Sequence, residues 1–466
     1  MSAREPIPSS STDAPPPAYA PDAQGIPHAR LWSFLGPAFI ASIAYIDPGN
    51  FATNILAGSR FGYRLLWVLL WSNAMAILIQ YLSAKMGIVT GLTLPQNCRR
   101  HFSRPVSLSL WAAAEIGAIA TDLAEFLGAA LGLDLLCSPI FYHYGMSPRG
   151  ALIFAALVAA VLVFAILALE LAGFRWLERG IMGFVGVIGL CYAFEVFLVH
   201  PDWTAAAFST FVPRLDRSSS TAFHESIYAA VGMLGATVMP HVVYLHSSLV
   251  HPRLRELGGD TSSRGDFDFA GMRPIKLPQR SILSRYLHFE TLDVLVAMNG
   301  AFLINSGMVI VAACALANGP GGSPTVEQAY QTLGPLFGPA AAMVFAIALL
   351  CSGLSSSTVG VMAGQVIIEG FLNVRFPIFL RRLITIIPAV LVIASGMDPL
   401  RILVLSQVVL SFALPFALIP LLMLTSRSGV MRSFANSRLT NTAGWLCVSV
   451  ILSLNAILLV QLAMGQ

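Results

Sequence analysis

Apolar stretches of roughly 20 residues recur along most of this chain, and each is long enough to cross the ~30 Å hydrocarbon core of a bilayer. Polar side chains are correspondingly scarce. Of the 466 residues, 56 % are hydrophobic and 11 % are charged, whereas ordinary globular proteins have about 25 % charged residues. The mean hydropathy is +0.75. This balance excludes a soluble enzyme, a disulfide-rich secreted domain and a disordered scaffold, and it predicts an all-α membrane protein with many spans.

Eleven stretches are predicted to be transmembrane helices, at 32–58, 64–88, 107–136, 151–169, 177–199, 225–250, 291–317, 335–365, 379–396, 400–424 and 441–464. With the N-terminus in the cytoplasm, 21 of the 27 Lys and Arg residues fall in inside segments. The other six fall outside, at Arg60, Arg64, Arg149, Arg214, Arg217 and Arg401. The positive-inside rule therefore favours a cytoplasmic N-terminus and an external C-terminus.

Two of the predicted spans are interrupted at their centres. Asp47-Pro48-Gly49-Asn50 breaks span one, and Met239-Pro240-His241 breaks span six. Proline lacks the amide hydrogen that a helix needs, and freed backbone groups are tolerated in lipid only where protein or a watery cavity surrounds them. Ordinary proline kinks are the alternative, but both breaks carry polar residues. Breaks five spans apart favour a five-plus-five inverted repeat with a binding site where the broken helices meet.

This pattern predicts four regions along the chain. A disordered cytoplasmic tail at 1–29 precedes a first repeat at 30–200 (spans 1–5). A second repeat at 201–425 (spans 6–10) includes a flexible cytoplasmic loop at 251–289, and 426–466 adds an eleventh span at the edge. The six cysteines form no CxxC pair and most lie in apolar runs, so neither a metal cluster nor a disulfide framework is expected.

The two breaks bring together an unusual set of ligand atoms. Asp47 lies mid-membrane, where an ionised carboxylate costs at least ~3 kcal/mol, so it needs a cation, a proton or a counter-charge. Asn50 offers an amide oxygen, Met239 offers a thioether, and the breaks loosen the carbonyls of Ala44 and Ala236. A lone membrane Met usually packs the core, but this one directly precedes a proline break. Mg²⁺ and Ca²⁺ prefer all-oxygen ligands, whereas softer transition metals accept sulfur.

Span three carries three carboxylates, Glu115, Asp122 and Glu125, whose spacing of seven and three residues places them on one helical face. Such stripes mark proton relays or ion paths, or else a structural salt-bridge network. The candidate counter-ions are Arg381, Arg382 and Arg253.

Other polar residues within the spans are weaker signals. His241 adjoins the second break and titrates near neutral pH, which suits a proton-linked or gating role. His246 is expected to form a hydrogen bond between helices, and Gln407 in span ten can supply an amide oxygen. Solvated or packing roles are the default for the acids near predicted span ends, which are Glu195, Glu225 and Asp293.

Three segments resemble signatures of the NRAMP family of divalent-metal transporters. AYIDPGNFATNILAGSRFGY (44–63) resembles the family's first-helix signature, EIGAIATDLAEFLGAALGL (115–133) its third, and ATVMPHVVYLHSSLV (236–250) its sixth. The resemblance extends from residue 30 to 464. It is closest to the bacterial branch, the MntH-type proton-coupled manganese transporters.

The resemblance implies a LeuT-like fold, alternating access and particular residue roles. The implied metal ligands are the side chains of Asp47, Asn50 and Met239, the carbonyls of Ala44 and Ala236, and, in some conformations, Gln407. The implied proton pathway leads from Asp47 to Asp122 and the adjoining Glu125, Arg381 and Arg382, with Glu115 on the same helical face and His241 linked to the pH dependence of transport. Leu56 and Val242 depart from polar residues common in parts of the family.

The resulting hypothesis is a proton-coupled symporter of the bacterial inner membrane that imports Mn²⁺, and also Fe²⁺, Co²⁺ and Cd²⁺. It predicts no enzymatic activity, no resident cofactor, no nucleic-acid partner and no obligate protein partner. A magnesium transporter on a related scaffold is one alternative, although Met239 would be a poor ligand for Mg²⁺. An organic-solute symporter of the same fold is another, although Asp47 would repel a substrate carboxylate. A sensor would need a large soluble domain, and an intramembrane enzyme would need a motif such as HExxH or GxSxG.

Overall fold

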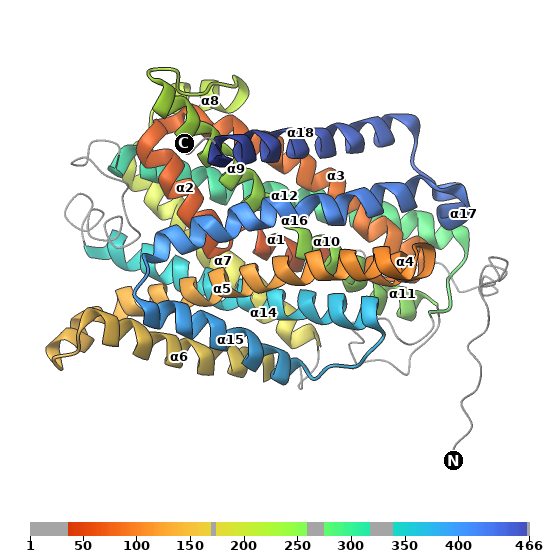
Figure 1. The fold of residues 1–466 in the computed structure, drawn as a ribbon, viewed down its shortest axis with the longest axis horizontal. Helices are drawn as coiled ribbons and strands as arrows, with labels where there is room; N and C mark the ends of the chain where they lie inside the picture. Colours follow the sequence, from red (N-terminus) through yellow and green to blue (C-terminus); the bar gives the residue numbers. More distant parts are fainter. Residues whose placement is uncertain (1–35, 169–173, 259–274, 317–338, 464–466) are drawn as a thin grey trace, which may run out of the picture.

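The computed structural model describes residues 36–168, 174–258, 275–316 and 339–463, and these ranges are helical without any β-strand (Figure 1). The predicted all-α class is therefore confirmed. The predicted tail at 1–29 lies outside the described residues.

The helices of the first half are α1 (Pro37–Ala44), α2 (Pro48–Phe61), η2 (Gly62–Leu65), α3 (Leu66–Thr90), α4 (Leu94–His101), α5 (Arg104–His143), α6 (Pro148–Ala168) and α7 (Phe174–Val199). The next group comprises α8 (Trp203–Phe211), α9 (Ser220–Thr237), α10 (Pro240–Leu249), α11 (His251–Leu257) and α12 (Arg280–Leu316). The last group comprises α14 (Pro339–Leu372), α15 (Ile378–Ser395), α16 (Pro399–Ser426), α17 (Ser428–Met431), η4 (Arg432–Phe434) and α18 (Arg438–Ala463).

Each predicted span coincides with one helix or with a broken pair, from α1 and α2 for span one to α18 for span eleven. Within the described ranges, nine helical stretches are long and apolar enough to cross a membrane, and one of them, Pro48–Thr90, joins half of span one to span two. The short α15, whose apolar run includes Arg381 and Arg382, is not among the nine. The chain is thus a multi-pass membrane protein, and the count of eleven crossings stays a prediction.

The loop predicted at 251–289 is partly helical. Residues 251–257 form α11, and residues 280–289 form the first turns of α12. Leu254, Leu283 and Tyr286 are fully buried in one apolar cluster at this place. Burial of these scattered apolar side chains favours helix in a segment whose many charges concealed the helical period.

Both predicted breaks are present, and each follows from a proline. In a continuous helix the amide of residue 48 would bond the carbonyl of Ala44, and the amide of residue 240 would bond that of Ala236. Pro48 and Pro240 have no such hydrogen. The residue before each proline is extended, with φ −79° and ψ 168° at Asp47 and with φ −89° and ψ 125° at the second break. Two pairs of half-helices result, α1 with α2 and α9 with α10.

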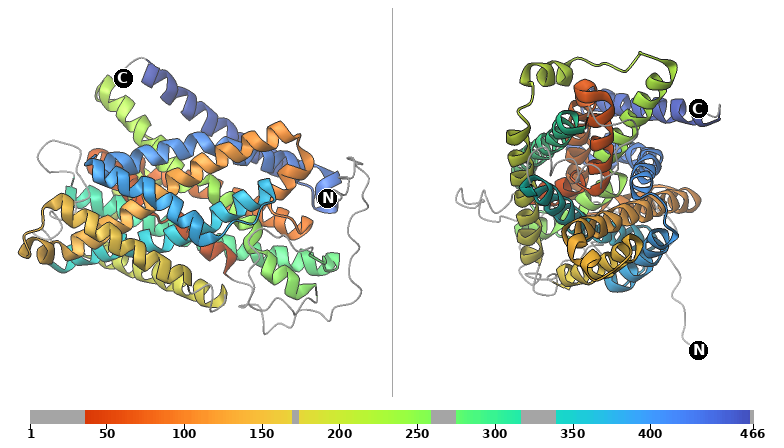
Figure 2. Two further views of the ribbon diagram at one scale, coloured as in Figure 1. Left: turned by 60° about the horizontal axis from the view of Figure 1, so that its bottom comes forward. Right: turned by 90° about the vertical axis from the view of Figure 1, so that its left-hand side faces the viewer.

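The broken helices lie at the centre of the molecule. Figures 1 and 2 show α1 and α10 inside the bundle, with α6 and α15 towards one side and α18 on the opposite side. Every residue of α10 is buried, whereas α6, α7 and α18 expose large apolar residues such as Leu157, Phe197 and Leu446. Extensive apolar surface of this kind suits contact with lipid. The polar breaks are therefore shielded from the bilayer by the surrounding helices.

Small residues let α5 and α14 approach closely beside the first break. A Cβ atom added to Gly132 of α5 would clash with the backbone of α14, and one added to Gly353 of α14 would clash with the backbone of α5. Gly128, one turn before Gly132, lies equally close to the ring of Pro48. Small residues at such contacts hold membrane helices together because lipid removes the hydrophobic drive for their association. The first break is therefore packed directly against α5.

Gly132→Ala is expected to destabilise the protein by roughly 1–3 kcal/mol, because the added methyl overpacks this contact. The matched control is Gly186→Ala on the exposed side of α7, where an added Cβ meets nothing within 4 Å. This control should be neutral or slightly stabilising, since Gly is unfavourable inside a helix. The apparent melting temperatures of the purified variants in detergent would test this, and equal values would contradict close packing.

Candidate functional site

Asp47 is the N-cap residue of α2 and is completely buried. Its Oδ1 accepts hydrogen bonds from the backbone amide of Asn50 at 2.8 Å and from Nδ2 of Asn50 at 2.7 Å. Its Oδ2 is buried without a hydrogen-bond partner among the described residues. The positive end of α2 favours negative charge at this position. The carboxylate therefore keeps one oxygen available for a cation or a proton.

Asn50 joins the two breaks. Its Nδ2 also donates to the carbonyl of Ala236 at 3.0 Å, which is the carbonyl that Pro240 leaves without a helical partner. Its Oδ1 is buried and unpartnered within the described part of the chain. The carbonyl of Ala236, in the last turn of α9, thus lies against the Asn50 side chain, while Ala44 is the last residue of α1.

Gln407 of α16 and Met239 complete the predicted donor set. A Cβ atom on Gly49 would overlap the Gln407 amide and lie 2.9 Å from Oδ2 of Asp47, so this glutamine packs beside Asp47. Oε1 of Gln407 is a further buried acceptor with no partner in the described ranges. Met239 is fully buried and caps α10 immediately before Pro240. Contacts therefore connect Asp47, Asn50, Ala236 and Gln407, while Ala44 and Met239 lie at the broken ends themselves.

The chemistry of this group suits a cation. Three buried acceptors, Asp47 Oδ2, Asn50 Oδ1 and Gln407 Oε1, receive no hydrogen bond from the described residues. Leaving such groups unsatisfied away from water is unfavourable. Within the described ranges, no cluster of three or more His, Cys, Asp and Glu residues forms an ordinary metal site. One carboxylate, amide and carbonyl oxygens and one thioether are therefore the donors that this part of the molecule offers.

The three carboxylates of α5 face α14 and α15, as their spacing predicted. Glu115 forms an ion pair with Arg381 at 3.0 Å, and Asp122 lies 3.9 Å from the guanidinium of Arg382. Arg382 is fully buried, donates a short hydrogen bond to the hydroxyl of Ser357 and stacks over an aromatic ring of α5. The predicted partners Arg381 and Arg382 are therefore brought to the stripe.

Glycines of α14 make room for these charges. A Cβ atom on Gly360 would overlap a carboxylate oxygen of Glu125 and approach Oδ1 of Asp122 to 2.9 Å, and one on Gly364 would overlap the guanidinium of Arg381. Glu125 is fully buried, and it lies within electrostatic range of both Asp122 and Asp47. Glu125 thus links the candidate metal site to the charged stripe.

His241 lies between the second break and the same stripe. Oγ1 of Thr121 donates to the carbonyl of Gly117 at 3.0 Å and lies 3.2 Å from Nδ1 of His241. Because a hydroxyl has one hydrogen, this geometry assigns the imidazole hydrogen to Nδ1. Nε2 of His241 is then a bare acceptor, buried and unpartnered within the described part of the chain. Its contact residue, Thr121, directly precedes Asp122.

Sequence reasoning missed a hydrogen-bond chain that begins at the first break. Gln80 donates to the hydroxyl of Tyr45 at 2.7 Å, and its Oε1 lies 2.9 Å from Nδ1 of His246. Nε2 of His246 lies 2.9 Å from Oε1 of Glu290. The expected interhelical role of His246 is thus present, and its partners are Gln80, inside an apolar run, and Glu290, directly before predicted span seven; both are fully buried. Those two residues were the available signal.

The broken backbone of span one is held by two more residues that the sequence analysis did not select. Asn305 of α12 donates to the carbonyl of Tyr45 at 2.6 Å, and Ser352 of α14 donates to the carbonyl of Ile46 at 2.5 Å. Both lie in spans, and the Ser-rich run 352–358 was a visible signal. These bonds satisfy carbonyls that the break would otherwise leave open.

Arg253 does not pair with the stripe, so that candidate assignment was wrong. It pairs with Glu178 of α7 at 2.8 Å, beside Gly36 at the start of α1. It lies beyond the end of α10, away from the carboxylates of α5. Asp293 is fully buried, and its Oδ2 accepts hydrogen bonds from the amides of Gly36 and Ala38 at 3.0 Å each, so it caps α1.

Glu195 is also buried, whereas Glu225 is partly exposed and pairs with Arg60 at 2.8 Å. Glu225 therefore has the solvated role that was expected of an acid near a span end. Asp293 has a packing role, since it caps α1. It is buried and not at a span end because α12 begins at Arg280, well before residue 293.

The fold and the site together define a class: a multi-pass helical membrane protein with a buried oxygen-rich site between two broken helices. Comparison with known proteins identifies the family within that class. Residues 38–461 match the family described as "Natural resistance-associated macrophage protein-like", and the chain belongs to this Nramp family. The resemblance inferred from the three sequence signatures is confirmed.

Two relatives cover nearly the whole chain. A protein named "Divalent metal cation transporter MntH" from Caldanaerobacter subterraneus subsp. tengcongensis is 44 % identical over 442 residues, which are 95 % of this chain and 96 % of the relative. A protein of the same name from Bacillus subtilis is 46 % identical over 433 residues, which are 92 % of each chain.

Solved structures agree with this assignment. The crystal structure of the Eremococcus coleocola manganese transporter in complex with an aromatic bis-isothiourea substituted compound aligns with a TM-score of 0.77 at 30 % identity, covering 94 % of this chain and 88 % of that one. Mhp1, a nucleobase-cation-symport-1 family transporter, aligns with a TM-score of 0.57 at 12 % identity, covering 91 % and 90 %, and shares the fold alone. The predicted LeuT-like architecture is confirmed.

Asp47→Asn is expected to weaken binding of a divalent transition metal such as Mn²⁺ by more than about 100-fold, because even outer-shell changes cost about 10–100-fold. The variant keeps the N-cap acceptor but removes the charge. Asp398→Asn, at an exposed ion pair with Arg401, is the matched control and should bind as wild type does. Isothermal titration calorimetry of the purified protein gives both affinities. Unchanged affinity in Asp47→Asn would refute the site.

Proposed function

We propose that this chain is a proton-coupled symporter that imports Mn²⁺ into the cytoplasm by alternating access, with Fe²⁺, Co²⁺ and Cd²⁺ as further substrates. The observation that carries the proposal is the set of buried oxygens of Asp47, Asn50 and Gln407, which lie beside two broken helices and receive no hydrogen bond from the part of the chain that the structure describes. The names of the relatives, a divalent metal cation transporter and a manganese transporter, support it. The metal is cargo, and the proposal includes no resident cofactor, no enzymatic step, no nucleic acid and no obligate protein partner.

The proposed location is the bacterial inner membrane, with the N-terminus in the cytoplasm and the C-terminus outside. The names of the bacterial relatives support the membrane, and the distribution of Lys and Arg supports the orientation. Import then carries the metal from the side where α2 ends towards the side where α1 begins.

Selectivity is assigned to the sulfur of Met239. An all-oxygen site with one carboxylate would accept Mg²⁺ or Ca²⁺, whereas a thioether favours softer transition metals. A site of this kind suits an ion better than an organic solute.

Movement of the half-helices is required for transport. Asp47, Asn50, Met239 and Gln407 are all without solvent exposure in this conformation, so an ion cannot enter or leave without rearrangement. Because α1 is a separate eight-residue helix, it can move independently of α2. The cap that Asp293 provides and the Tyr45–Gln80–His246–Glu290 chain hold α1 in the closed arrangement. Release of these bonds would open the side on which α1 begins.

Proton coupling follows from competition at Asp47. A bound divalent cation favours the ionised carboxylate, so the proton on Asp47 must leave as the metal binds. Glu125 and Asp122 are the nearest further carboxylates along α5, and Arg381 and Arg382 sit beyond them. The displaced proton passes to Asp122 and then along this charged path to the cytoplasm.

Met239→Ala should keep part of the Mn²⁺ uptake and gain uptake of Mg²⁺ and Ca²⁺, because oxygen ligands remain when the sulfur is removed. Metal uptake into proteoliposomes, with and without an inward proton gradient, measures this change. Met233→Ala removes an equally buried methionine of α9, away from the break, and should keep wild-type selectivity. If wild-type protein already carries Mg²⁺ as well as Mn²⁺, the magnesium alternative replaces the proposal.

Asp122→Asn should reduce metal-driven proton influx to the level of protein-free vesicles while retaining much of the Mn²⁺ uptake, because it removes the proton acceptor and leaves the metal ligands intact. A pH-sensitive dye and a metal-sensitive dye in parallel vesicles give the two rates. Asp134→Asn, on the same helix, is the control. Parallel loss of both rates in Asp122→Asn alone would instead indicate a purely structural network.

A further inference from the structure

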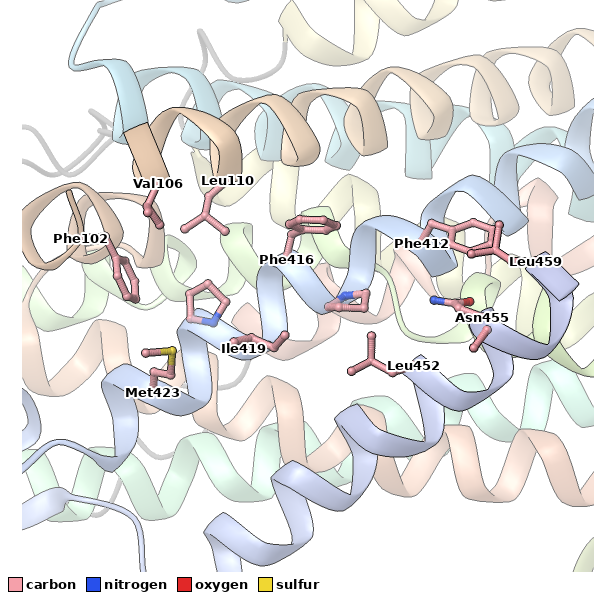
Figure 3. A pocket seen from close by; sticks show the side chains of 13 residues that line it. Phe102, Val106, Leu110, Phe412, Phe416, Ile419, Met423, Leu452, Asn455 and Leu459 are labelled. Atoms are coloured by element: carbon pink, nitrogen blue, oxygen red, sulfur yellow. The ribbon is translucent and has the colours of Figure 1, made fainter. Parts of the chain in front are cut away.

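An apolar groove lies on the outside of the bundle, between α5, α16 and α18 (Figure 3). Its volume is about 530 Å³, and its lining includes Phe102 just before α5, Leu110 of α5, Phe416 and Met423 of α16, and Leu452 of α18. Along α16 the groove extends from residue 412 to residue 423, which is roughly 16 Å at the helical rise. The groove follows α16, and none of the residues at the two helix breaks lines it.

The lining offers no unmet polar group. Asn455 lines the groove, but its Oδ1 accepts from the hydroxyl of Ser411 at 2.7 Å and its Nδ2 donates to the carbonyl of Ser411 at 2.8 Å. That carbonyl is free because Pro415 cannot donate the next helical hydrogen bond. A polar ligand would therefore find no hydrogen-bond partner in the groove, whereas a hydrocarbon chain would fill it without leaving any polar group unsatisfied.

Positive charge gathers at one end of the groove. Arg100 and Arg104 are exposed on either side of Phe102, and Arg427 is exposed one turn after Met423. Partial burial and the positive charges of Arg100 and Arg427 lower the pKa of His101, which places both guanidinium groups near that imidazole. Within the described ranges, none of these three arginines pairs with a carboxylate. The apolar groove thus ends at an uncompensated basic rim.

We propose that this groove and its rim bind an anionic phospholipid, with an acyl chain along α16 and the phosphate between Arg100 and Arg427. Basic pockets between membrane helices bind anionic head groups, and each basic residue near the membrane surface adds attraction. The rim lies on the side that the distribution of Lys and Arg assigns to the cytoplasm, where it would face inner-leaflet lipid. This site goes beyond the proposed transport function and does not depend on it.

Native mass spectrometry of the full-length protein tests the proposal with lipids of matched chains. After delipidation, the protein is given an equimolar mixture of phosphatidylglycerol and phosphatidylcholine. Wild type should retain phosphatidylglycerol over phosphatidylcholine by at least about fivefold. Arg100→Gln with Arg427→Gln should abolish this preference, whereas the charge-matched pair Arg149→Gln with Arg401→Gln, away from the groove, should keep it.

A second pair of variants tests the chain-binding part. Ala456→Trp places a large ring in the groove from an exposed position of α18 and should lose retained lipid, while Val450→Trp, also exposed on α18 but outside the lining, should keep it. Equal retention of the two lipids by wild type, or undiminished retention in Ala456→Trp, would overturn the proposal. A lipid-free dimer that Ala456→Trp dissociates would assign the groove to a second copy instead.

Discussion

The missing amide hydrogens of Pro48 and Pro240 are the constraint on which the rest of this structure depends. In water such gaps would be filled by solvent, but in a bilayer each freed carbonyl needs a partner from the protein. Asn50 of α2 bonds the Ala236 carbonyl that Pro240 frees. Asn305 of α12 and Ser352 of α14 bond the carbonyls of Tyr45 and Ile46, which lie within the first break. The breaks must therefore lie where several helices meet. The two half-helix pairs accordingly occupy the centre of the bundle, and an oxygen-rich site forms between them.

Once the breaks are central, the charged residues around them determine how the neighbouring helices pack. Glu125 and Asp122 can lie buried beside the site because Gly360 of α14 leaves space for their carboxylates. The same helix approaches α5 through Gly353, where any side chain would clash. The close packing against α5 and the buried carboxylates therefore lie on one face of α14. Both need a glycine at the contact, Gly353 for the packing and Gly360 for the carboxylates. The arrangement confines charge to a narrow path and keeps lipid from reaching it.

Local features of the chain were predictable from the sequence, and features that depend on helix neighbours were not. Hydropathy and proline act on a few adjacent residues, so the spans, both breaks and the face of α5 that carries Asp122 followed from them. The partner of Arg253 depends on the distance from α11 to α7, which no local pattern encodes, and the sequence analysis assigned it to the wrong carboxylates. Glu290 and Gln80 look like isolated polar residues until the fold brings them to His246.

Helix α16 has proline-freed carbonyls of the same kind as those at the two central breaks. Pro415 and Pro420 free the carbonyls of Ser411 and Phe416. Side chains of neighbouring helices donate hydrogen bonds to them. Asn455 of α18 donates to Ser411 at 2.8 Å, and the Tyr244 hydroxyl of α10 donates to Phe416 at 3.2 Å. Under the proposed alternating access, a motion of α10 would therefore be passed to α16 by a hydrogen bond as well as by packing. Since α16 also carries Gln407, the groove between α16 and α18 is mechanically connected to the candidate metal site. An occupant of that groove would stabilise whichever position of α16 it fits better, and would thereby bias the site it never touches.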